Sequence, residues 1–476
     1  MDGYLNTSDT ICAQATVHGS SAIAVIRVSG PDSIDVVSSI FKPYKGVTFS
    51  DTKSHNLRFG AIYKENELLD EVVVSLFRAP HSYTGEDSVE ISCHGSVYIQ
   101  QEIIFLLLSK GLRMARPGEF SQRAFLNGKM DLAQAEAVAD LISSETLASH
   151  RIAIQQMKGG FSKELSVMRQ SLLDIVSLME LELDFSEEDV EFADRSRLKE
   201  LLEKVESHIS GLIESFKLGN VIKNGVPVAI VGATNTGKST LLNAILGEER
   251  AIVSEIHGTT RDFIEDVINI NGVAFRFIDT AGIRQTKEAI EIIGIERTFE
   301  KIKSASIVIL LLDAERPDGF EESLKQLKSN IDIAFQKVVV LINKVDLNYS
   351  EKAIKEMLAS VKSEAGKINL ALYSLLPVSA KRMTHLVELK EILSKAQKNV
   401  SIGTDTTLVT NIRHYQALSD TRDALLRVNE GLDQSVPTDL LTQDIREALF
   451  HIGEIVGEIN TEELLGNIFS KFCIGK

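Results

Sequence analysis

Eight consecutive residues, Gly232 to Ser239, constrain the fold of this chain more than any other feature. They read Gly-Ala-Thr-Asn-Thr-Gly-Lys-Ser and fit the phosphate-binding pattern G-x-x-x-x-G-K-[ST] at every fixed position. The apolar run Val226–Val231 precedes them, and the helical pattern Thr240–Leu246 follows. Glycines let the backbone curl so that its amides face a phosphate, and the start of a helix adds partial positive charge. The segment therefore predicts a strand, a phosphate loop and a helix within a mostly parallel α/β sheet.

Three further motifs follow the phosphate loop in an order that is typical of GTP-binding proteins. Asp279–Gly282 reads Asp-Thr-Ala-Gly, Asn343–Asp346 reads Asn-Lys-Val-Asp and Ser379–Lys381 reads Ser-Ala-Lys, each at the end of an apolar strand pattern. The Asp346 carboxylate can accept hydrogen bonds from N1 and the 2-amino group of guanine, and adenine lacks that pair of donors. The motifs predict a site that binds and hydrolyses GTP. The residues expected at this site are Asn235, Thr236, Gly237, Lys238, Ser239, Thr240, Ser254, Glu255, Ile256, His257, Gly258, Thr259, Thr260, Asp279, Thr280, Ala281, Gly282, Asn343, Lys344, Asp346, Ser379, Ala380 and Lys381.

The same motifs predict a Mg²⁺ ion beside the phosphates. Ser239 and Thr260 are its expected ligands, and Asp279 is expected to hold it through a water molecule. Ile283 follows the Asp-Thr-Ala-Gly motif where many small GTPases carry a glutamine that orients the attacking water. This segment resembles the translation-factor-related class of GTPases, in the group with a hydrophobic residue at that place. Such a chain must find its catalytic help elsewhere.

The sequence pattern changes along the 476 residues and predicts several domains. Residues 1–127 mix short strand patterns with one helix, Val97–Lys110, which indicates an α+β domain. Residues 128–219 and 385–476 are helical, and residues 220–384 alternate strands with helices. We expect one all-helical domain with the α/β domain inserted in it; two separate helical domains are the alternative. The apolar helical stripes contain Leu165, Met168, Leu172, Val176, Met179 and Leu183, and then Leu441, Ile445, Leu449, Ile452, Ile455 and Ile459.

Composition limits the classes of partner. The net charge of −16 argues against a broad nucleic-acid-binding surface, so any contact with RNA is expected to be local or shared with a partner. The three cysteines have no metal-binding spacing and form no disulfide framework, which favours a reducing cytoplasm. No apolar run reaches the length of a membrane span, and we expect none.

Other segments carry a resemblance that extends along the chain. These segments are Asp9–Thr16, Tyr83–Asp87, Arg116–Lys129, Asp131–Glu136 and the ending Phe472–Lys476. With the GTPase motifs, they resemble the MnmE (TrmE) family of GTPases that modify uridine in tRNA. The resemblance implies an N-terminal domain that binds tetrahydrofolate and dimerises, followed by a helical domain with an inserted GTPase domain.

The resemblance also implies a function. Members of this family act with an FAD-containing partner, MnmG or GidA, in a heterotetramer. The complex adds an aminomethyl-type group to C5 of the wobble uridine of certain tRNAs. The one-carbon unit comes from 5-formyl-tetrahydrofolate or a related tetrahydrofolate. Hydrolysis of GTP is stimulated by K⁺ and by pairing of the GTPase domains.

Residues carry over from the family one by one. Arg27, Glu90, Lys129 and Lys476 match the folate-contacting positions, since cations suit the carboxylates of folate and a glutamate suits the donor edge of the pterin. Each of them, taken alone, also reads as a surface charge. The K⁺ ligands are matched by Asn235, Ser254, Ile256 and Thr259, with serine at 254 where the family commonly has threonine.

Two catalytic residues are implied in the same way. Glu291 matches the family's catalytic glutamate and would position the attacking water; its other interpretation is a solvated helix charge beside Glu288 and Glu296. Cys473 matches a cysteine that the family requires for modification. A nucleophilic thiol there would need a depressed pKa, and a buried hydrophobic thiol is the alternative.

Two other classes of protein share parts of this pattern. A regulatory RNA-binding GTPase of ribosome assembly would have the same nucleotide motifs, but it would normally carry a basic RNA-binding appendage. A membrane-remodelling GTPase would need an anchor or a basic amphipathic helix, and neither is evident. Both remain alternatives to a GTPase of tRNA modification.

Overall fold

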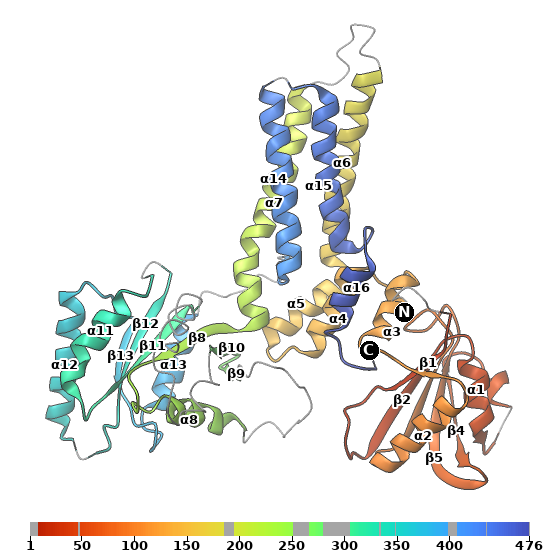
Figure 1. Cartoon of the computed structure of the whole chain (residues 1–476), viewed down its shortest axis with the longest axis horizontal. Coiled ribbons are helices and arrows are strands. Elements are labelled where there is room, and N and C mark those ends of the chain that lie inside the picture. The colour runs from red at the N-terminus through yellow and green to blue at the C-terminus, as the bar shows by residue number, and fades with distance from the viewer. Residues whose placement is uncertain are drawn as a thin grey trace. The chain divides into compact units, whose positions relative to one another are not determined.

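A computed structural model of the chain describes residues 8–45, 48–184, 195–250, 266–278, 305–332, 335–347, 349–397, 407–434 and 436–475. It divides into two compact units (Figure 1). The first unit contains residues 1–143, 153–213 and 413–476, and the second contains residues 144–152 and 214–412.

The N-terminal part of the first unit is a seven-stranded sheet in the order β3-β4-β5-β6-β2-β1-β7. Its strands are β1 (Ile11–Gln14), β2 (Ile23–Ser29), β3 (Phe41–Pro43), β4 (Asn56–Lys64), β5 (Glu67–Phe77), β6 (Ser88–His94) and β7 (Arg113–Met114). Helices α1 (Ser33–Ile40) and α2 (Val97–Ser109) pack on one face, where Val37 and Ile103 join the buried residues of the strands. A single-turn 3₁₀ helix, η1, spans Phe49–Asp51. The predicted α+β domain is confirmed, and its predicted helix coincides with α2, but α1 and a further helix at Glu119–Leu126 were not predicted.

The rest of the first unit is helical. Its helices are α3 (Glu119–Leu126), α4 (Leu132–Ile142), α6 (Gly160–Asp184), α14 (Ile412–Asp433), α15 (Thr438–Val456) and α16 (Glu462–Phe469), with parts of α5 (Leu147–Met157) and α7 (Arg195–Asn224). In Figure 1 the long helices α6, α7, α14 and α15 run side by side. Ion pairs cross between them, from Lys199 on α7 to Asp433 on α14 (2.7 Å) and from Arg446 on α15 to Glu180 on α6 (2.6 Å). The two helical flanks therefore form one bundle, and the predicted insertion is confirmed.

The apolar stripes predicted for these helices form the core of the bundle. On α6, the residues at helical spacing from Leu165 to Met179 are buried. On α15, Leu441, Ile445, Ile452 and Ile455 are buried, Leu449 is half-buried, and Ile459 lies beyond the end of the helix. A helix that repeats apolar residues every three or four positions buries one stripe and leaves the opposite face in water.

The second unit contains a six-stranded sheet in the order β13-β12-β11-β8-β10-β9. Its strands are β8 (Val226–Val231), β9 (Asp266–Ile270), β10 (Val273–Ile278), β11 (Ile307–Asp313), β12 (Lys337–Asn343) and β13 (Ser374–Pro377). Neighbours pair in parallel, except β9, which is antiparallel to β10. Helices α8 (Lys238–Arg250) and α13 (Leu386–Ala396) pack on one face, and η3 (Pro317–Gly319), α11 (Phe320–Lys328) and α12 (Glu351–Lys367) lie with the other layer. Helices on both faces explain why β11 is buried along its whole length.

The second unit extends beyond residues 220 and 384, where we placed the domain boundaries. Leu389 and Leu393 of α13 are fully buried in the core of the sheet. The second unit also contains a small apolar cluster that joins three distant parts of the chain, formed by Ile152, Ile222 and Leu408. Among the described helices, none is long and apolar enough to cross a membrane.

Candidate functional sites

The phosphate loop lies between the end of β8 and the start of α8, as the sequence predicts. Gly232 and Gly237 have φ values of 153° and 95°, and Asn235 at the tip has a φ of 63°. A side chain at Gly237 would collide with the amide of Asn343. Glycine is therefore required at Gly237 both for the turn of the backbone and for the close approach of a second motif.

The Lys238 side chain folds back onto the phosphate loop. Its ammonium nitrogen donates hydrogen bonds to the carbonyl oxygens of Gly232 and Ala233, each at 2.8 Å. Burial lowers the pKa of Lys238, because the charged form loses hydration. A phosphate bound in this loop would favour the charged form and is a stronger acceptor than a carbonyl oxygen. The lysine is thus positioned to exchange backbone partners for the phosphates of a nucleotide.

Asn343 holds the nucleotide motifs together. Its side chain is buried, and its amide nitrogen donates to the carbonyl oxygen of Thr236 in the phosphate loop at 2.8 Å. Its side-chain oxygen accepts from the backbone amide of Ala380 at 3.0 Å. One asparagine therefore fixes the phosphate loop and the Ser-Ala-Lys loop in relation to each other. Our sequence analysis placed Asn343 at the nucleotide site but did not foresee this bridging role.

Asp346, the last residue of the Asn-Lys-Val-Asp motif, contacts the Ser-Ala-Lys loop. The hydroxyl of Ser379 donates to its carboxylate at 2.7 Å, and Nε of Arg382 lies 3.4 Å away. The Ser379 hydrogen bond is the main cause that lowers the pKa of Asp346. An ionised carboxylate can accept two hydrogen bonds, which the guanine edge can donate. Lys344, the second residue of this motif, instead pairs with Asp313 at 2.6 Å and supports the loop.

The structure describes only part of the predicted nucleotide site. Ser239 and Thr240 lie in the first turn of α8, where Ser239 is half-buried, and Lys381 is exposed beyond Ala380. Of the predicted Mg²⁺ and K⁺ ligands, the described ones are Ser239 and Asn235. The predicted residues outside the described ranges are Ser254, Glu255, Ile256, His257, Gly258, Thr259, Thr260, Asp279, Thr280, Ala281, Gly282, Glu291 and Lys476.

A second group of predicted residues gathers in the first unit. Arg27 on β2 and Glu90 on β6 face each other in the sheet register and form an ion pair at 2.7 Å. The Arg27 guanidinium lies 5.3 Å from the ring centroid of Tyr83 and 5.6 Å from that of Phe120. The ammonium of Lys129 donates to the carbonyl oxygen of Pro80, in the loop that carries Tyr83. Arg27 and Glu90 are thus in contact, and Lys129 lies against the neighbouring loop.

The C-terminal segment reaches this same group. Arg27 donates to the carbonyl oxygen of Gly475 at 3.4 Å. Gly475 has a φ of 94°, and a side chain there would collide with the backbone of Gln14. Cys473 is exposed, so the alternative of a buried thiol does not hold for it. The segment that carries Cys473 therefore ends on the strand next to Arg27.

Gly118 explains how the C-terminal segment is seated. Its φ of 68° starts α3, and a Cβ atom there would lie 2.6 Å from the carbonyl oxygen of Phe469. Its amide donates to the carbonyl oxygen of Cys473 at 3.4 Å. Phe469 and Phe472 pack with Leu132 in one apolar cluster. The signature segments at 9–16, 116–129 and 472–476 therefore meet in space.

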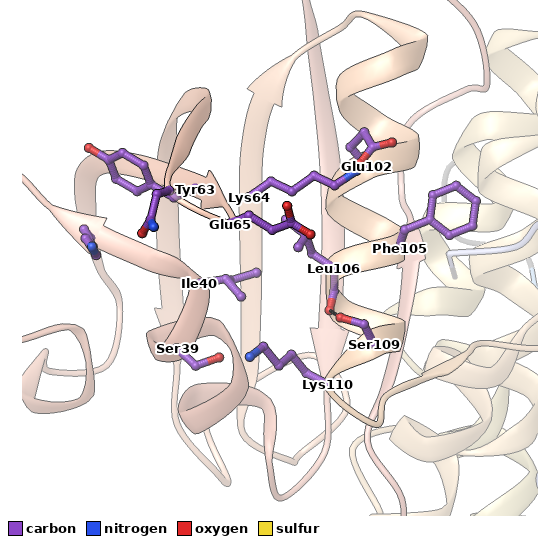
Figure 2. Close-up of a pocket in the computed structure, with 12 residues that line it drawn as sticks. Ser39, Ile40, Tyr63, Lys64, Glu65, Glu102, Phe105, Leu106, Ser109 and Lys110 are labelled. Carbon is purple, nitrogen blue, oxygen red and sulfur yellow. Dashed lines mark hydrogen bonds and ion pairs between the residues drawn. The ribbon is translucent and has the colours of Figure 1, made fainter.

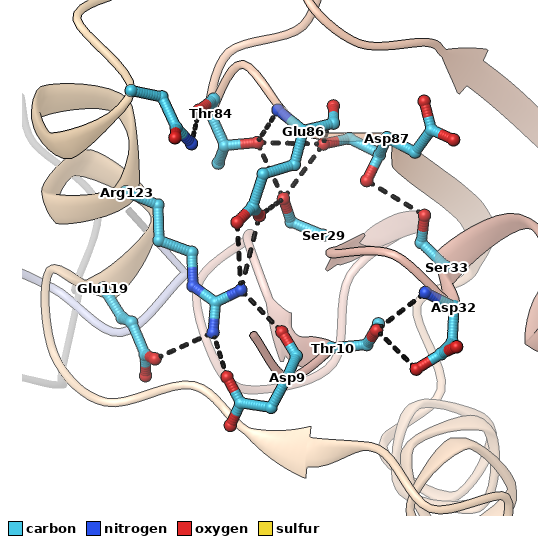
Figure 3. A network of polar contacts seen from close by, with 12 residues as sticks. Asp9, Thr10, Ser29, Asp32, Ser33, Thr84, Glu86, Asp87, Glu119 and Arg123 are labelled. Atoms are coloured by element: carbon cyan, nitrogen blue, oxygen red, sulfur yellow. Dashed lines mark hydrogen bonds and ion pairs between the residues drawn. The ribbon is translucent and has the colours of Figure 1, made fainter. Parts of the chain in front are cut away.

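A buried arginine supports this arrangement, and our sequence analysis did not identify its role. The Arg123 side chain is 1% exposed and bonds to Asp9 at 2.6 Å, to Glu86 at 3.2 Å and to Glu119 at 3.2 Å (Figure 3). Burial opposes ionisation of Glu119, but hydrogen bonding, first from Arg113, holds the pKa of Glu119 below its ordinary value. The network ties the start of β1 and the loop before β6 to α3. The Arg123 network thus holds in place the elements that surround Arg27.

A second buried ion cluster joins the helices. Oε2 of Glu136 on α4 lies 2.6 Å from Nε2 of His414 and 2.9 Å from Nη2 of Arg413, at the start of α14. Arg413 also donates to the carbonyl oxygens of Glu454 (2.7 Å) and Ile455 (3.0 Å) near the end of α15. Burial opposes ionisation of Glu136, but His414 and Arg413 outweigh it and lower its pKa to about 2. The cluster joins α4, α14 and α15 where the chain returns from the second unit.

The parallel sheet with helices on both faces and a phosphate loop between β8 and α8 defines the second unit as a P-loop GTPase domain. Two family models match most of the chain. Residues 10–129 match the GTP-binding protein TrmE N-terminus, and residues 132–473 match the MnmE helical domain. The chain therefore belongs to the MnmE family of tRNA modification GTPases.

Full-length relatives agree with this assignment. The tRNA modification GTPase MnmE of Bacteroides thetaiotaomicron is 54% identical over 471 residues, which cover 98% of this chain and 99% of that protein. The protein of the same name from Flavobacterium johnsoniae is 51% identical over 472 residues, with the same coverage. Among solved structures, a GTP-binding protein from Sulfolobus solfataricus in complex with GDP is 20% identical, covering 49% of this chain and 68% of that one. Its TM-score of 0.28 is too low to relate the two folds as wholes.

Proposed function

We propose that this chain uses GTP hydrolysis to drive modification of the wobble uridine of certain tRNAs in the cytoplasm. It acts with an FAD-containing partner, MnmG or GidA, and adds an aminomethyl-type group to C5 of the uridine. A tetrahydrofolate such as 5-formyl-tetrahydrofolate supplies the one-carbon unit. The chain forms a homodimer through its N-terminal domain and a heterotetramer with the partner, and K⁺ stimulates hydrolysis.

The observation that supports this proposal is the meeting of three segments around Arg27. Glu90 pairs with Arg27 from the neighbouring strand, and the carbonyl oxygen of Gly475 accepts a hydrogen bond from it. The exposed thiol of Cys473 lies two residues before Gly475. A guanidinium, a carboxylate and aromatic rings are the groups that suit a folate, which has carboxylates, a hydrogen-bonding pterin edge and a planar ring. The residues present therefore fit the group that the family implies.

In this proposal, residues of the chain bind GTP and orient it for hydrolysis. The phosphate loop and Lys238 hold the phosphates, Asp346 selects the guanine edge, and Asn343 keeps the two parts in register. Bound Mg²⁺, with Ser239 and Thr260 as proposed ligands, would neutralise charge that develops on the phosphates. K⁺ held by Asn235, Ser254, Ile256 and Thr259 would add to that neutralisation. Glu291 is proposed to position the attacking water.

Mass spectrometry of tRNA from cells that lack this chain tests the proposal. Wobble uridine is expected to remain unmodified, and return of the wild-type chain is expected to restore the modification. An Arg27→Ala variant is expected to hydrolyse GTP normally but to restore little modification, because it loses the ion pair at the folate site. Normal modification in cells lacking the chain would contradict the proposal.

Titration with 5-formyl-tetrahydrofolate separates this proposal from a regulatory RNA-binding GTPase of ribosome assembly. The purified chain is expected to bind the folate saturably, and Arg27→Ala is expected to weaken that binding. A matched control is Arg58→Ala, on β4 of the same domain and outside the folate site. Absence of saturable folate binding, with no effect of Arg27→Ala, would favour the regulatory GTPase.

A further inference from the structure

The guanidinium of Arg27, at the proposed folate site, is held by hydrogen bonds along its edges. Its Nε and Nη2 atoms donate to Oε1 of Glu90 at 3.0 Å and 2.7 Å, and Nη1 donates to the carbonyl oxygen of Gly475 at 3.4 Å. Within the described ranges, these contacts use three of the five N–H groups that a guanidinium carries. One N–H group on each terminal nitrogen is left for a ligand, and the Arg27 side chain is 16% exposed, so a ligand can reach it.

Two aromatic rings lie against the same guanidinium. Its central carbon is 5.3 Å from the ring centroid of Tyr83 and 5.6 Å from that of Phe120. A cation near the face of an aromatic ring is attracted by the negative charge of that face. Such a contact holds the guanidinium without using any of its N–H groups. Phe120 is fully buried and Tyr83 is half-buried, so these rings contribute to the interior beside Arg27.

The Tyr83 ring is itself fixed by helix α3. Its hydroxyl is hydrogen-bonded to the hydroxyl of Ser121, a buried residue of α3, at 2.8 Å. The loop that carries Tyr83 is fastened to the end of the same helix, because the side-chain amide of Asn127 donates to the carbonyl oxygen of Thr84 at 2.8 Å. The ring also packs on the apolar cluster that contains Phe120. The position of Tyr83 is therefore set before any ligand binds.

An arginine that is ordered in advance binds a ligand more tightly than a mobile one. The long side chain of arginine has many rotamers, and ordering it when a ligand binds costs affinity. Contacts that order the side chain beforehand remove this cost. More hydrogen bonds from the protein would order Arg27 as well, but each would take an N–H group away from the ligand. A ring against the guanidinium avoids that loss.

We propose that Tyr83 is a positioning residue of the folate site. The face of its ring holds the Arg27 guanidinium, and the two remaining N–H groups of Arg27 stay available for oxygen atoms of the folate. Tyr83 acts on the folate through Arg27, and Ser121 acts in turn through Tyr83. The inference rests on the function proposed above, in which Arg27 binds a tetrahydrofolate. It also gives a physical role to the first residue of the Tyr83–Asp87 segment, which our sequence analysis used only for the family resemblance.

Titration of the full chain with 5-formyl-tetrahydrofolate tests this proposal. Tyr83→Leu removes the ring and is expected to weaken folate binding about tenfold, as for a cation–π contact away from water. Tyr83→Phe keeps the ring and loses only the hydrogen bond to Ser121, so it should restore most of the affinity and bind about threefold more weakly than the wild type. Ser121→Ala loses the same hydrogen bond and should match Tyr83→Phe. All these variants should hydrolyse GTP at the wild-type rate.

A double-mutant cycle separates positioning from direct contact with the folate. In an Arg27→Gln background, Tyr83→Leu is expected to have no further effect on folate affinity, because the ring no longer has a guanidinium to hold. A further loss of affinity in that background would show that Tyr83 contacts the folate itself and would overturn the proposal. Unchanged affinity in Tyr83→Leu would also overturn it. If Tyr83→Leu does not fold, Ser121→Ala gives the answer, and wild-type affinity in that variant would refute the role of Tyr83.

Tyr63 provides a matched control in the same domain. Its ring centroid lies 4.9 Å from the ammonium of Lys42. Tyr63 lines a cavity of about 780 Å³ between α1, the turn that joins β4 to β5, and α2 (Figure 2). None of the residues that line this cavity belongs to the group around Arg27. Tyr63→Leu thus loses a cation–π contact of the same kind and should leave folate affinity unchanged.

An equal loss of affinity in Tyr63→Leu and Tyr83→Leu would mean that either change loosens the whole domain, and it would overturn the assignment to Tyr83. Absence of saturable folate binding by the wild-type chain is a different outcome. It would refute the proposed function and, with it, this inference.

Discussion

Replacing Glu136 by glutamine should destabilise the helical part of the first unit by about 3 kcal/mol. Its carboxylate is buried and its pKa falls from 4.5 to about 2 because His414 and Arg413 lie beside it. Each pKa unit corresponds to about 1.4 kcal/mol, so this difference gives about 3 kcal/mol of stability. Breaking a buried ion pair by removal of one partner costs about 3–5 kcal/mol, which agrees. Glutamine keeps the shape of the side chain but removes the carboxylate charge beside Arg413 and His414.

Hydrogen exchange followed by mass spectrometry can measure this loss locally. Amides of α4 and α14 that open with the cluster should lose about a hundredfold of their protection in Glu136→Gln near neutral pH. Glu430→Gln is the matched control, because Glu430 is exposed on the same helix as Arg413 and should have no effect. GTP turnover serves as a second control and should stay at the wild-type rate, since Glu136 lies outside the nucleotide site.

The pH dependence gives a further check with a definite sign. The folded pKa of Glu136 is depressed, so its contribution is fully present above the ordinary value of 4.5 and is lost as the pH falls toward about 2. The difference in stability between wild type and Glu136→Gln should therefore narrow as the pH falls through that window. Two results would refute the reasoning: amide protection in Glu136→Gln within about twofold of the wild type near neutral pH, or a stability difference between the two proteins that widens in acid.

Three other predictions follow from the sites. Asp346→Asn should weaken GTP binding by about tenfold or more, measured by titration, because a neutral amide cannot accept both guanine hydrogen bonds; equal affinity would contradict the assignment. Glu291→Ala should slow GTP turnover while nucleotide affinity stays intact, and a near-unchanged rate would remove Glu291 from catalysis. Cys473 should react with a maleimide in the folded chain while Cys12 and Cys93 do not, because both are buried and burial raises the pKa of each to about 11; rapid labelling of all three by mass spectrometry would contradict the described core.

The second unit could be predicted well because its motifs mark the ends of its strands. The predicted strand Val226–Val231 coincides with β8. Strand β9 was not predicted, although the Asn271-Gly272 turn after it, with φ values of 52° and 84°, is a strong hairpin signal. Motif spacing was sufficient to predict the strands at the nucleotide motifs, because each motif is a short local pattern that follows the end of its strand.

The buried clusters could not be predicted from one sequence. Glu136 and Arg413 are 277 positions apart, and no local pattern of spacing links them. Arg123 lies in a segment that carried the family resemblance, and Glu119 precedes it by four residues on the same helix, but its other two carboxylate partners, Asp9 and Glu86, come from distant parts of the chain. In a single sequence, a charged residue usually reads as a surface residue, because few charged side chains are fully buried. Only the fold shows that these charges lie in the interior.

The two ends of the segment 214–412 meet, and this has a consequence for protein engineering. The Val409 amide donates to the hydroxyl of Ser215 at 3.0 Å, so a cut at each end would leave the helical bundle with a gap that a short linker can close. The excised piece, however, would lose Ile152, which packs against Ile222 and Leu408. A stand-alone version of the GTPase domain should therefore need polar replacements at Ile222 and Leu408. Without them, it will tend to associate through a newly exposed apolar patch.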